Sequence, residues 1–383
     1  MKLLIHHHAV AYNEGKSIWI QSSIGAWVRE LSFYFSEIGL LVHISKEKLP
    51  IQDYQICSSN IKIQSLEIND TKNRINRNRL IKKKCKTVSS QYDCLLIRGI
   101  TPRQLLVYNN CDVKTKYYLF IQSLIESKPE FKFTKNDIIA WAFYKYRILQ
   151  LNRIFKSCNV LSNSPQTVLE LSKIMNIKAK FVPTNTISLE EFEPMEFRGI
   201  GSPIKLLFCA RVNKEKGIEE LIEAVSILKL EGVKTTLTVI GKVEPDYEKK
   251  LIRLCESRNV DVDVIFVGFV NFGMDLMAQY KESDIYVLPS WHEGFPKTIW
   301  EAGANCTPII VTRVGGISGL VNDDEVFFIN AKCPKEISEG IKSLTSNQER
   351  TEDRVISMYK KAQSYSVENC AKKLFQVVNY QSE

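Results

Sequence analysis

The sequence predicts an α/β protein built from two domains, each with a mostly parallel sheet. The chain has 383 residues, which is more than one hydrophobic core usually organises. Short apolar runs alternate with helical patterns along its length, as repeated βαβ units do. With 44% hydrophobic and 25% charged residues, the composition is that of an ordinary globular protein rather than a disordered or fibrous one.

The first domain is expected over residues 1–194. Six apolar runs in it are typical of strands, and the polar, amphipathic segments between them suit crossover helices. The expected strands are 2–7, 40–45, 93–97, 116–121, 159–162 and 180–182. Glycines and flanking prolines break the pattern over residues 195–203, so we expect the interdomain hinge there.

The second domain is expected over residues 204–364, where the alternation of strands and helices begins again. The strands are expected at 205–209, 235–240, 264–267, 285–288, 308–311 and 326–329. Helices are expected at 217–230, 247–258, 274–282 and 297–305. The tail is helical in pattern, and its last helix, 365–383, is expected to pack back on the first domain.

Sequence composition also indicates the cellular compartment in which the protein is expected. No stretch approaches the ~20 apolar residues of a membrane-spanning helix, and the start of the chain lacks the pattern of a signal peptide. The ten cysteines form no Cys-x-x-Cys pair, which suits reduced thiols better than a disulfide framework or a zinc site. We therefore expect a cytoplasmic protein.

A basic tract, Lys72 to Lys86, stands out in a chain of net charge +9. Two interpretations have equal weight: a solvated surface, or a patch that binds anionic lipid or phosphorylated substrate, with about 1 kcal/mol per residue near a charged membrane. The second would place the protein peripherally at the cytoplasmic face of the inner membrane. Aromatic and basic residues interleaved over 131–155 are a weaker candidate for membrane contact, because such stripes more often belong to the core. No nucleic-acid partner is expected.

The segment from Trp291 to Gly303 carries the clearest chemical signal. A strand ends, a glycine-containing loop turns, and Pro296 stands where a helix would start. A helix start at the carboxyl end of a parallel strand attracts anions. Glu293 and Glu301, with seven residues between them, bracket this feature, and carboxylates suit sugar hydroxyls. The arrangement fits a sugar nucleotide, although two isolated glutamates would be ordinary surface residues.

The Glu293-Gly-Phe-Pro and Glu301-Ala-Gly sequences resemble the donor motif of retaining glycosyltransferase family 4. Arg211, followed by Lys216-Gly217 after the first strand of the second domain, resembles the basic motif of the same family. The resemblance implies a GT-B fold, in which two Rossmann-like domains with parallel sheets face each other across a cleft. The first domain would bind the acceptor, and the second the nucleotide sugar.

By the same resemblance, Arg211 and Lys216 bind the donor diphosphate and neutralise the leaving group, which is the electrostatic task that usually dominates such catalysis. Glu293 would face the sugar near the anomeric carbon, and Glu301 would accept hydrogen bonds from the ribose. The other donor-binding residues implied are Gly294, Phe295, Pro296, Lys297, Thr298, Gly241, Phe269 and Val270. Because basic side chains supply the positive charge, neither a metal nor a cofactor is expected.

The acceptor side is less well marked. Residues 12–16 occupy the place of the family's glycine loop without its paired glycines. Gly15 therefore remains a candidate, together with Arg98 and Gln122, which are expected in loops after strands.

These observations predict a retaining enzyme that moves a hexose-type unit from a UDP- or GDP-sugar to a saccharide acceptor. The expected acceptor is lipid-linked, for example through polyprenyl diphosphate, and the expected role is bacterial surface polysaccharide biosynthesis, such as O-antigen (lipopolysaccharide) or capsule. Two alternatives stay open: a sugar-nucleotide epimerase of the same fold, and a non-catalytic sugar-nucleotide-binding protein. The glycine motifs of dehydrogenases and P-loop NTPases are absent.

Overall fold

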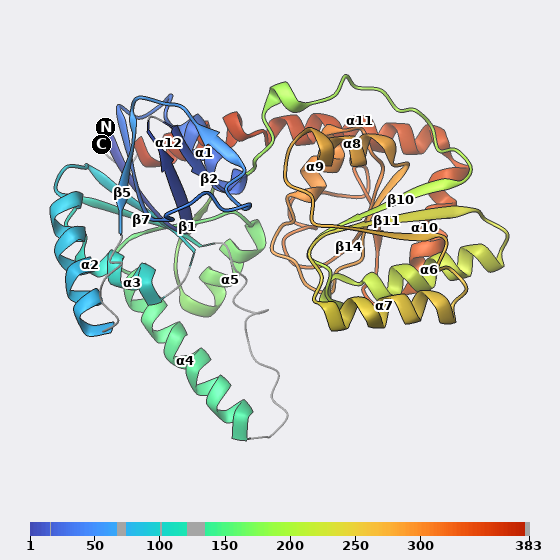
Figure 1. Ribbon diagram of the computed structural model, residues 1–383, viewed down its shortest axis with the longest axis horizontal. Coiled ribbons are helices and arrows are strands. Elements are labelled where there is room, and N and C mark those ends of the chain that lie inside the picture. Colours follow the sequence, from blue (N-terminus) through green and yellow to red (C-terminus); the bar gives the residue numbers. More distant parts are fainter. Residues whose placement is uncertain (16, 67–73, 100–101, 121–134, 380–383) are drawn as a thin grey trace. The chain divides into compact units, whose positions relative to one another are not determined.

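The computed structural model describes residues 1–15, 17–66, 74–99, 102–120 and 135–379. It divides the chain into two compact units, one of Met1–Thr186 with Val367–Glu383 and one of Ile187–Ser366 (Figure 1). The division lies before residues 195–203, where the sequence pattern places the hinge. Within that segment, the Ile200 N–H donates to Gln348 Oε1 at 3.2 Å, which attaches the segment to the second unit.

In the residues that the structure describes, the first unit is built on a nine-stranded sheet. In chain order the strands are β1 (Lys2–Glu14), β2 (Ser17–Ile20), β3 (Glu37–Ile44), β4 (Tyr54–Ile56), β5 (Ile61–Ser65), β6 (Cys94–Arg98), β7 (Thr115–Phe120), β8 (Asn159–Ser162) and β9 (Ala179–Phe181). Seven of them run parallel in the order β5-β3-β1-β6-β7-β8-β9. The last part of β1 forms an antiparallel hairpin with β2, and β4 pairs with β2.

Helices cover both faces of this sheet. One core cluster joins the sheet to α1 (Ser22–Leu31) and α12 (Val367–Asn379). The other joins it to the second group of helices, which are α2 (Arg74–Ser89), α3 (Pro102–Asn110), α5 (Pro165–Met175) and the last turns of α4 (Lys135–Phe155). The first unit is therefore a three-layer α/β/α domain with apolar packing on each face.

The C-terminal helix α12 completes the first unit. Leu374 and Val378 are fully buried in its core. The Phe375 ring stacks on Tyr34 with 5.3 Å between centroids, and Tyr117 Oη donates to the Val378 carbonyl at 3.0 Å. Residues from the far end of the sequence thus fill a core that residues 1–186 leave incomplete.

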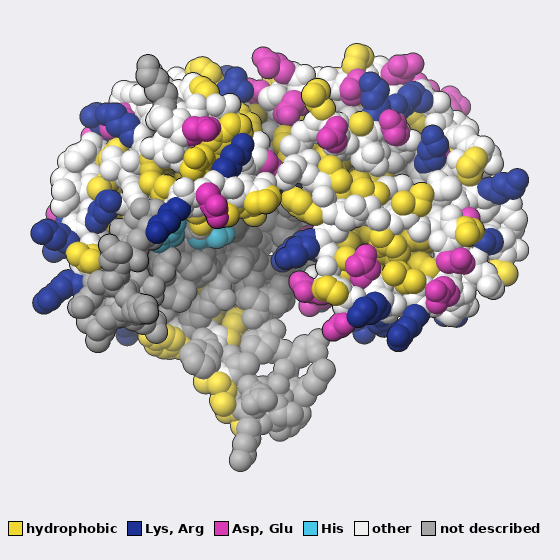
Figure 2. Space-filling view, in the orientation of Figure 1, with side chains coloured by type: hydrophobic (Ala, Val, Ile, Leu, Met, Phe, Trp, Pro, Cys, Tyr) yellow, Lys and Arg dark blue, Asp and Glu magenta, His cyan; other side chains and the backbone are white. Residues whose placement is uncertain are grey.

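Helix α4 extends away from the rest of the first unit (Figure 1). Its last turns are core, since Leu151 and Phe155 are buried. The preceding turns expose large apolar side chains, which Figure 2 shows along the projection; they are Ile138, Ile139, Trp141, Tyr146 and Leu149. Residues 131–134 of the aromatic segment identified in the sequence lie outside the described residues. The buried and exposed side chains named above show that its described part is partly core and partly exposed surface.

The second unit has six parallel strands in the order β12-β11-β10-β13-β14-β15. In chain order these are β10 (Ile204–Cys209), β11 (Thr235–Ile240), β12 (Val264–Gly268), β13 (Ile285–Leu288), β14 (Ile309–Thr312) and β15 (Phe327–Ile329). Its helices lie on both faces of the sheet (Figure 1), and they are α6 (Ile218–Leu230), α7 (Pro245–Ser257), α8 (Met274–Glu282), α9 (Thr298–Ala304), α10 (Pro334–Ser346) and α11 (Gln348–Ser364). In the described parts of the chain, no helix combines the length and hydropathy needed to cross a bilayer.

Candidate functional site

The order of strands in the second unit defines where a ligand would bind. The chain builds β10, β11 and β12 outward in one direction, and then returns to place β13 on the other side of β10. The loops after β10 and β13 therefore leave their strands in opposite directions. Open α/β sheets bind ligands at such a switch point, outside the carboxyl ends of the strands.

An ion pair joins the loops after β10 and β13 at this switch point. Lys216 follows β10 and Glu293 follows β13, and 2.5 Å separates Lys216 Nζ from Glu293 Oε1. Ser290 Oγ donates to the same carboxylate oxygen at 2.8 Å. Glu293 is only 8% exposed, so its carboxylate is held by two hydrogen-bond donors in a sheltered position. Of the three residues that the family resemblance singled out for chemistry, Lys216 and Glu293 are thus in direct contact, and Arg211 is not part of this ion pair.

Backbone contacts fix the loop after β10. The short helix η2 (Lys214–Lys216) is capped by Asn213, whose side chain accepts from the Lys216 N–H at 3.2 Å. Gly217 has a φ of +73°, and a Cβ there would lie 2.1 Å from the Pro289 carbonyl oxygen. The Trp291 N–H donates to the Glu215 carbonyl at 2.8 Å. Only glycine fits between these loops. The close approach of the two loops places Lys216 next to Glu293.

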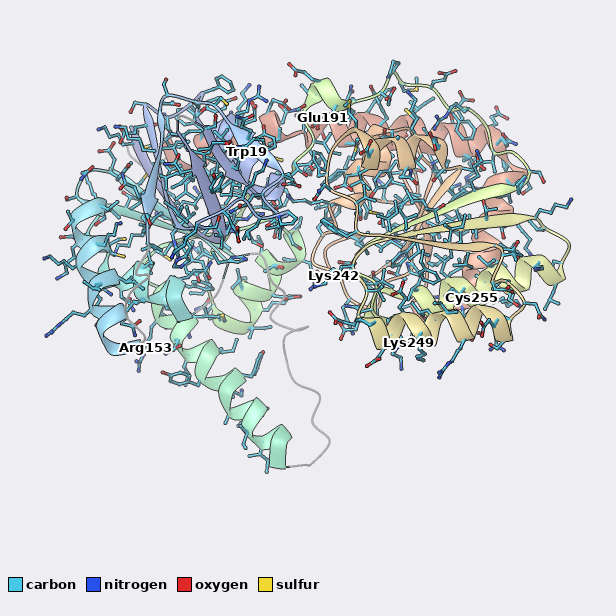
Figure 3. All side chains as sticks on the ribbon, in the orientation of Figure 1. Trp19, Arg153, Glu191, Lys242, Lys249 and Cys255 are labelled. Carbon is cyan, nitrogen blue, oxygen red and sulfur yellow. The ribbon has the colours of Figure 1, made fainter. Side chains whose placement is uncertain are left out.

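A second close approach joins the loops after β10 and β11. Gly241 has a φ of +145°, and a Cβ there would lie 1.7 Å from the Ala210 carbonyl oxygen. The Gly241 N–H donates to the Gly268 carbonyl at 2.8 Å, which joins the loop after β12 to the same edge. Figure 3 labels Lys242, which is the residue after Gly241 and shows where this edge of the second unit lies.

Two further candidate residues at this edge, Phe269 and Arg211, are open to solvent. Phe269 is 63% exposed and offers an aromatic face, whereas Val270 is half-buried. Arg211 is exposed, and within the described residues it forms no ion pair with a carboxylate. These side chains therefore remain available for a ligand.

Glu301 lies in α9 and is 6% exposed. Tyr280 Oη, from α8, donates to Glu301 Oε2 at 2.8 Å. Burial raises the pKa of Glu301 above its ordinary value, and the Tyr280 hydrogen bond and the positive charge of Lys297 partly offset that rise. Sequence reasoning missed Tyr280, because no local motif shows which side chain of α8 meets α9.

Aromatic contacts hold the loop between Glu293 and α9. Phe295 stacks on Trp300 with ring centroids 4.7 Å apart, and Trp300 stacks in turn on Tyr365 at 4.7 Å. Tyr286 Oη, from β13, donates to Thr298 Oγ1 at 2.6 Å. These contacts fix the position of the helix start.

The helix start itself differs from the expectation. Helix α9 begins at Thr298 and has seven residues, so Pro296 and Lys297 precede the helix. Gly294 also belongs to a fixed loop, since its carbonyl accepts from the Gly316 N–H at 2.8 Å. Because a helix this short has a weak dipole, the positive charge of the site resides mainly on Lys216 and Arg211.

The three acceptor-side candidates occupy different kinds of position in the first unit. Gly15, with a φ of +63°, follows β1 at the turn of the β1–β2 hairpin. Arg98 is buried at the end of β6. Gln122 lies outside the described residues. Within the described chain, no group of three or more His, Cys, Asp or Glu side chains is arranged to hold a metal ion.

The fold of the chain is shared with solved structures. Those that align along the whole chain include glycosyltransferases of the GT-B type. Sucrose-phosphate synthase of Thermosynechococcus elongatus aligns over 100% of this chain and 99% of its own, with a TM-score of 0.76 and 14% identity. HepE of Anabaena, solved in complex with UDP-glucose, aligns over 99% and 100%, with a TM-score of 0.71 and 16% identity.

Sequence comparison matches most of the second unit to a known family. Residues 193–362, which lie within that unit, match the family described as glycosyl transferases group 1. An uncharacterised glycosyltransferase of Methanocaldococcus jannaschii is 32% identical over 239 residues, which are 58% of this chain and 60% of the relative. The capsular polysaccharide biosynthesis glycosyltransferase CapM of Staphylococcus aureus is 30% identical over 145 residues, 37% of this chain and 36% of the relative. The matches thus span less than two thirds of these relatives.

Proposed function

We propose that this chain is a retaining glycosyltransferase that uses a nucleoside diphosphate sugar as donor. The observation that carries the proposal is the Lys216–Glu293 ion pair at the switch point of the unit whose residues 193–362 match the glycosyl transferases group 1 family. In this proposal Lys216 and Arg211 bind the diphosphate, and Glu301 accepts hydrogen bonds from the ribose hydroxyls. Positive charge next to the leaving diphosphate stabilises the transition state without a metal.

Donor binding supplies the first test. We expect a UDP- or GDP-hexose, tested with EDTA present, to raise the melting temperature, because a ligand that binds only the folded state stabilises it by mass action. UDP-glucose is the first donor to try, since the similarly folded HepE was solved with it. Lys216→Ala should lose the shift, whereas the exposed neighbour Lys214→Ala should keep it. Equal shifts in both variants would refute the role of Lys216.

Turnover separates the proposal from its alternatives. Wild-type protein should transfer hexose to an acceptor with the anomeric configuration of the donor, which the proton coupling constant of the product reports. Glu293→Ala should lower the rate by about 100-fold or more, in the range for loss of a group that stabilises the transition state. Release of an altered free sugar without an acceptor would favour the epimerase, and donor binding without turnover would favour the non-catalytic protein.

For the acceptor, we propose a lipid-linked saccharide at the cytoplasmic face of a membrane, used in surface polysaccharide biosynthesis. The relative CapM is named for capsular polysaccharide biosynthesis. Two features of the first unit support membrane contact: the exposed apolar turns of α4, and the basic tract, whose exposed members on α2 include Arg79, Lys82, Lys83 and Lys86. Apolar and basic side chains in one domain suit an anionic lipid surface.

Vesicle sedimentation tests this part of the proposal. The protein should bind vesicles that contain phosphatidylglycerol and not vesicles of phosphatidylcholine alone. Trp141→Ala with Leu149→Ala should weaken binding at all salt concentrations, because it removes apolar contacts. Lys82→Ala with Lys83→Ala should weaken it mainly at low salt, where charge attraction is least screened. If neither pair changes binding, the first unit does not carry the membrane contact.

A further inference from the structure

Arg98 occupies a position in the first unit where a ligand would be expected. It is the last residue of β6, between β1 and β7 in the parallel sheet. Gly99, with a φ of +92°, turns the chain directly after it, and the Gln104 side-chain amide donates to the Arg98 carbonyl. The guanidinium therefore extends from a fixed backbone at the carboxyl edge of the sheet, where open α/β sheets bind ligands.

Among the residues that the structure describes, no carboxylate balances the charge of Arg98. Its side chain is only 7% exposed. One guanidinium nitrogen donates to the Ser23 carbonyl at 3.2 Å, and the group lies 5.6 Å from the centre of the Trp27 ring. Nε is buried without an acceptor, and within the described residues Arg98 forms no ion pair. A buried ion without a counter-charge destabilises the folded protein.

His8, a titratable residue that senses the charge of Arg98, adds no negative charge. His8 lies just past the part of β1 that pairs with β6, at an irregularity in the β1–β3 register. Burial, followed by the positive charge of Arg98, lowers the pKa of His8. Burial also lowers the pKa of Arg98, to about 10, so the guanidinium still carries its charge at neutral pH. Arg98 is therefore a buried positive charge at this edge of the first unit, whereas His8 is exposed to solvent.

We propose that Arg98 binds an oxyanion of the acceptor, a phosphate or carboxylate group next to the saccharide that is glycosylated. The proposal rests on the proposed function, which assigns acceptor binding to the first unit. An oxyanion would accept hydrogen bonds from the guanidinium, including Nε, and would supply the missing counter-charge. Arginine suits this task because its planar N–H groups match the two oxygens of such anions.

The first experiment compares stability without ligand. If Arg98 awaits a ligand, Arg98→Met should melt at the same temperature as wild type or higher, because the apolar side chain removes a buried, unbalanced charge. If Arg98 instead has only a structural role, Arg98→Met should melt well below wild type. The exposed Arg29→Met, in α1 of the same unit, is the matched control and should leave the melting temperature unchanged.

The second experiment measures anion binding in a Lys216→Ala background, so that the donor site does not contribute. We expect glucose 1-phosphate or glucuronate to raise the melting temperature, and neutral methyl glucoside not to. The sugar that gives the larger shift distinguishes a phosphate from a carboxylate. Adding Arg98→Met should abolish the shift, and adding Arg29→Met should not. Equal shifts with the neutral sugar, or shifts that survive Arg98→Met, would overturn the proposal.

Failure of this inference can be told apart from failure of the proposed function. Arg98→Met on its own should keep the full stabilisation by the nucleotide sugar, because Arg98 lies in the first unit and the donor residues lie in the second. Its transfer rate should fall through a higher KM for the acceptor with little change in the KM for the donor. Loss of donor binding in Arg98→Met would contradict the assignment of Arg98 to the acceptor.

Discussion

At the scale of single residues, the two buried glutamates of the proposed donor site differ in the number and charge of their hydrogen-bond partners. Glu293 has a cation and a hydroxyl as partners. Glu301 has the Tyr280 hydroxyl but lies in a more apolar setting, and its pKa is raised. A buried carboxylate with one donor is costly for stability, yet it is well suited to accept ribose hydroxyls.

Glu301→Gln should therefore stabilise the ligand-free protein while it weakens donor binding. Because the folded pKa of Glu301 lies above the unfolded one, the favourable contribution of this group is present at low pH and is lost as pH rises through the folded pKa. Near neutral pH the neutral amide removes that cost, and we expect a gain of about 1 kcal/mol in the free energy of unfolding.

Urea unfolding of both proteins across the acid range checks this prediction. The advantage of Glu301→Gln should shrink as pH falls toward 4.5, the ordinary value for the glutamate pKa, because wild-type Glu301 then becomes protonated as well. Titration calorimetry should give weaker nucleotide-sugar binding for the variant. A variant that is less stable at neutral pH would show that the carboxylate is better solvated than its burial indicates.

At the scale of elements, the second unit depends on loops that approach each other closely after β10, β11 and β13. Gly241→Ala should cost more than about 2 kcal/mol of stability, because it combines a backbone conformation that other residues rarely adopt with a Cβ placed against the Ala210 carbonyl. Gly232→Ala is the matched control. Its φ is +80°, but nothing lies within 4 Å of the added Cβ, so it should cost only about 1 kcal/mol.

Denaturant unfolding gives both values, and nucleotide-sugar binding gives the functional consequence. Gly241→Ala should weaken binding even under conditions where the protein is folded, since the loops after β10 and β12 would shift. Similar costs for the two variants would mean that the loop after β11 adapts without strain.

The sequence best predicts the bounds of those elements that form from a local apolar pattern alone. Strands β11 and β13 and helix α8 have the bounds expected from their apolar runs. Strands β2, β4 and β5 were missed: β2 and β4 have four and three residues and are held by antiparallel pairing to distant partners. The candidate site shows the same dependence on distant contacts. Local motifs predict Lys216 and Glu293, whereas Tyr280 reaches Glu301 only because helices α8 and α9 pack together.

At the scale of the whole molecule, the two units differ in how the chain builds them. The second unit is one continuous segment, Ile187–Ser366, whereas the first needs Val367–Glu383 from the far end of the chain. The buried side chains of α12, such as Leu374, are part of the first unit's core. Without them the apolar faces of α1 and the sheet would be exposed to water.

A fragment of residues 187–366 should therefore fold alone and bind the nucleotide sugar, because all proposed donor residues lie within it. A fragment of residues 1–186 should not fold cooperatively, since Leu→Ala changes at single buried positions already cost about 2–5 kcal/mol and the fragment lacks a whole helix. Joining residues 367–383 to its end through a glycine-rich linker should restore folding. Circular dichroism and thermal melts of the three fragments check these outcomes. A stable 1–186 fragment would show that α12 only covers a core that is already sufficient.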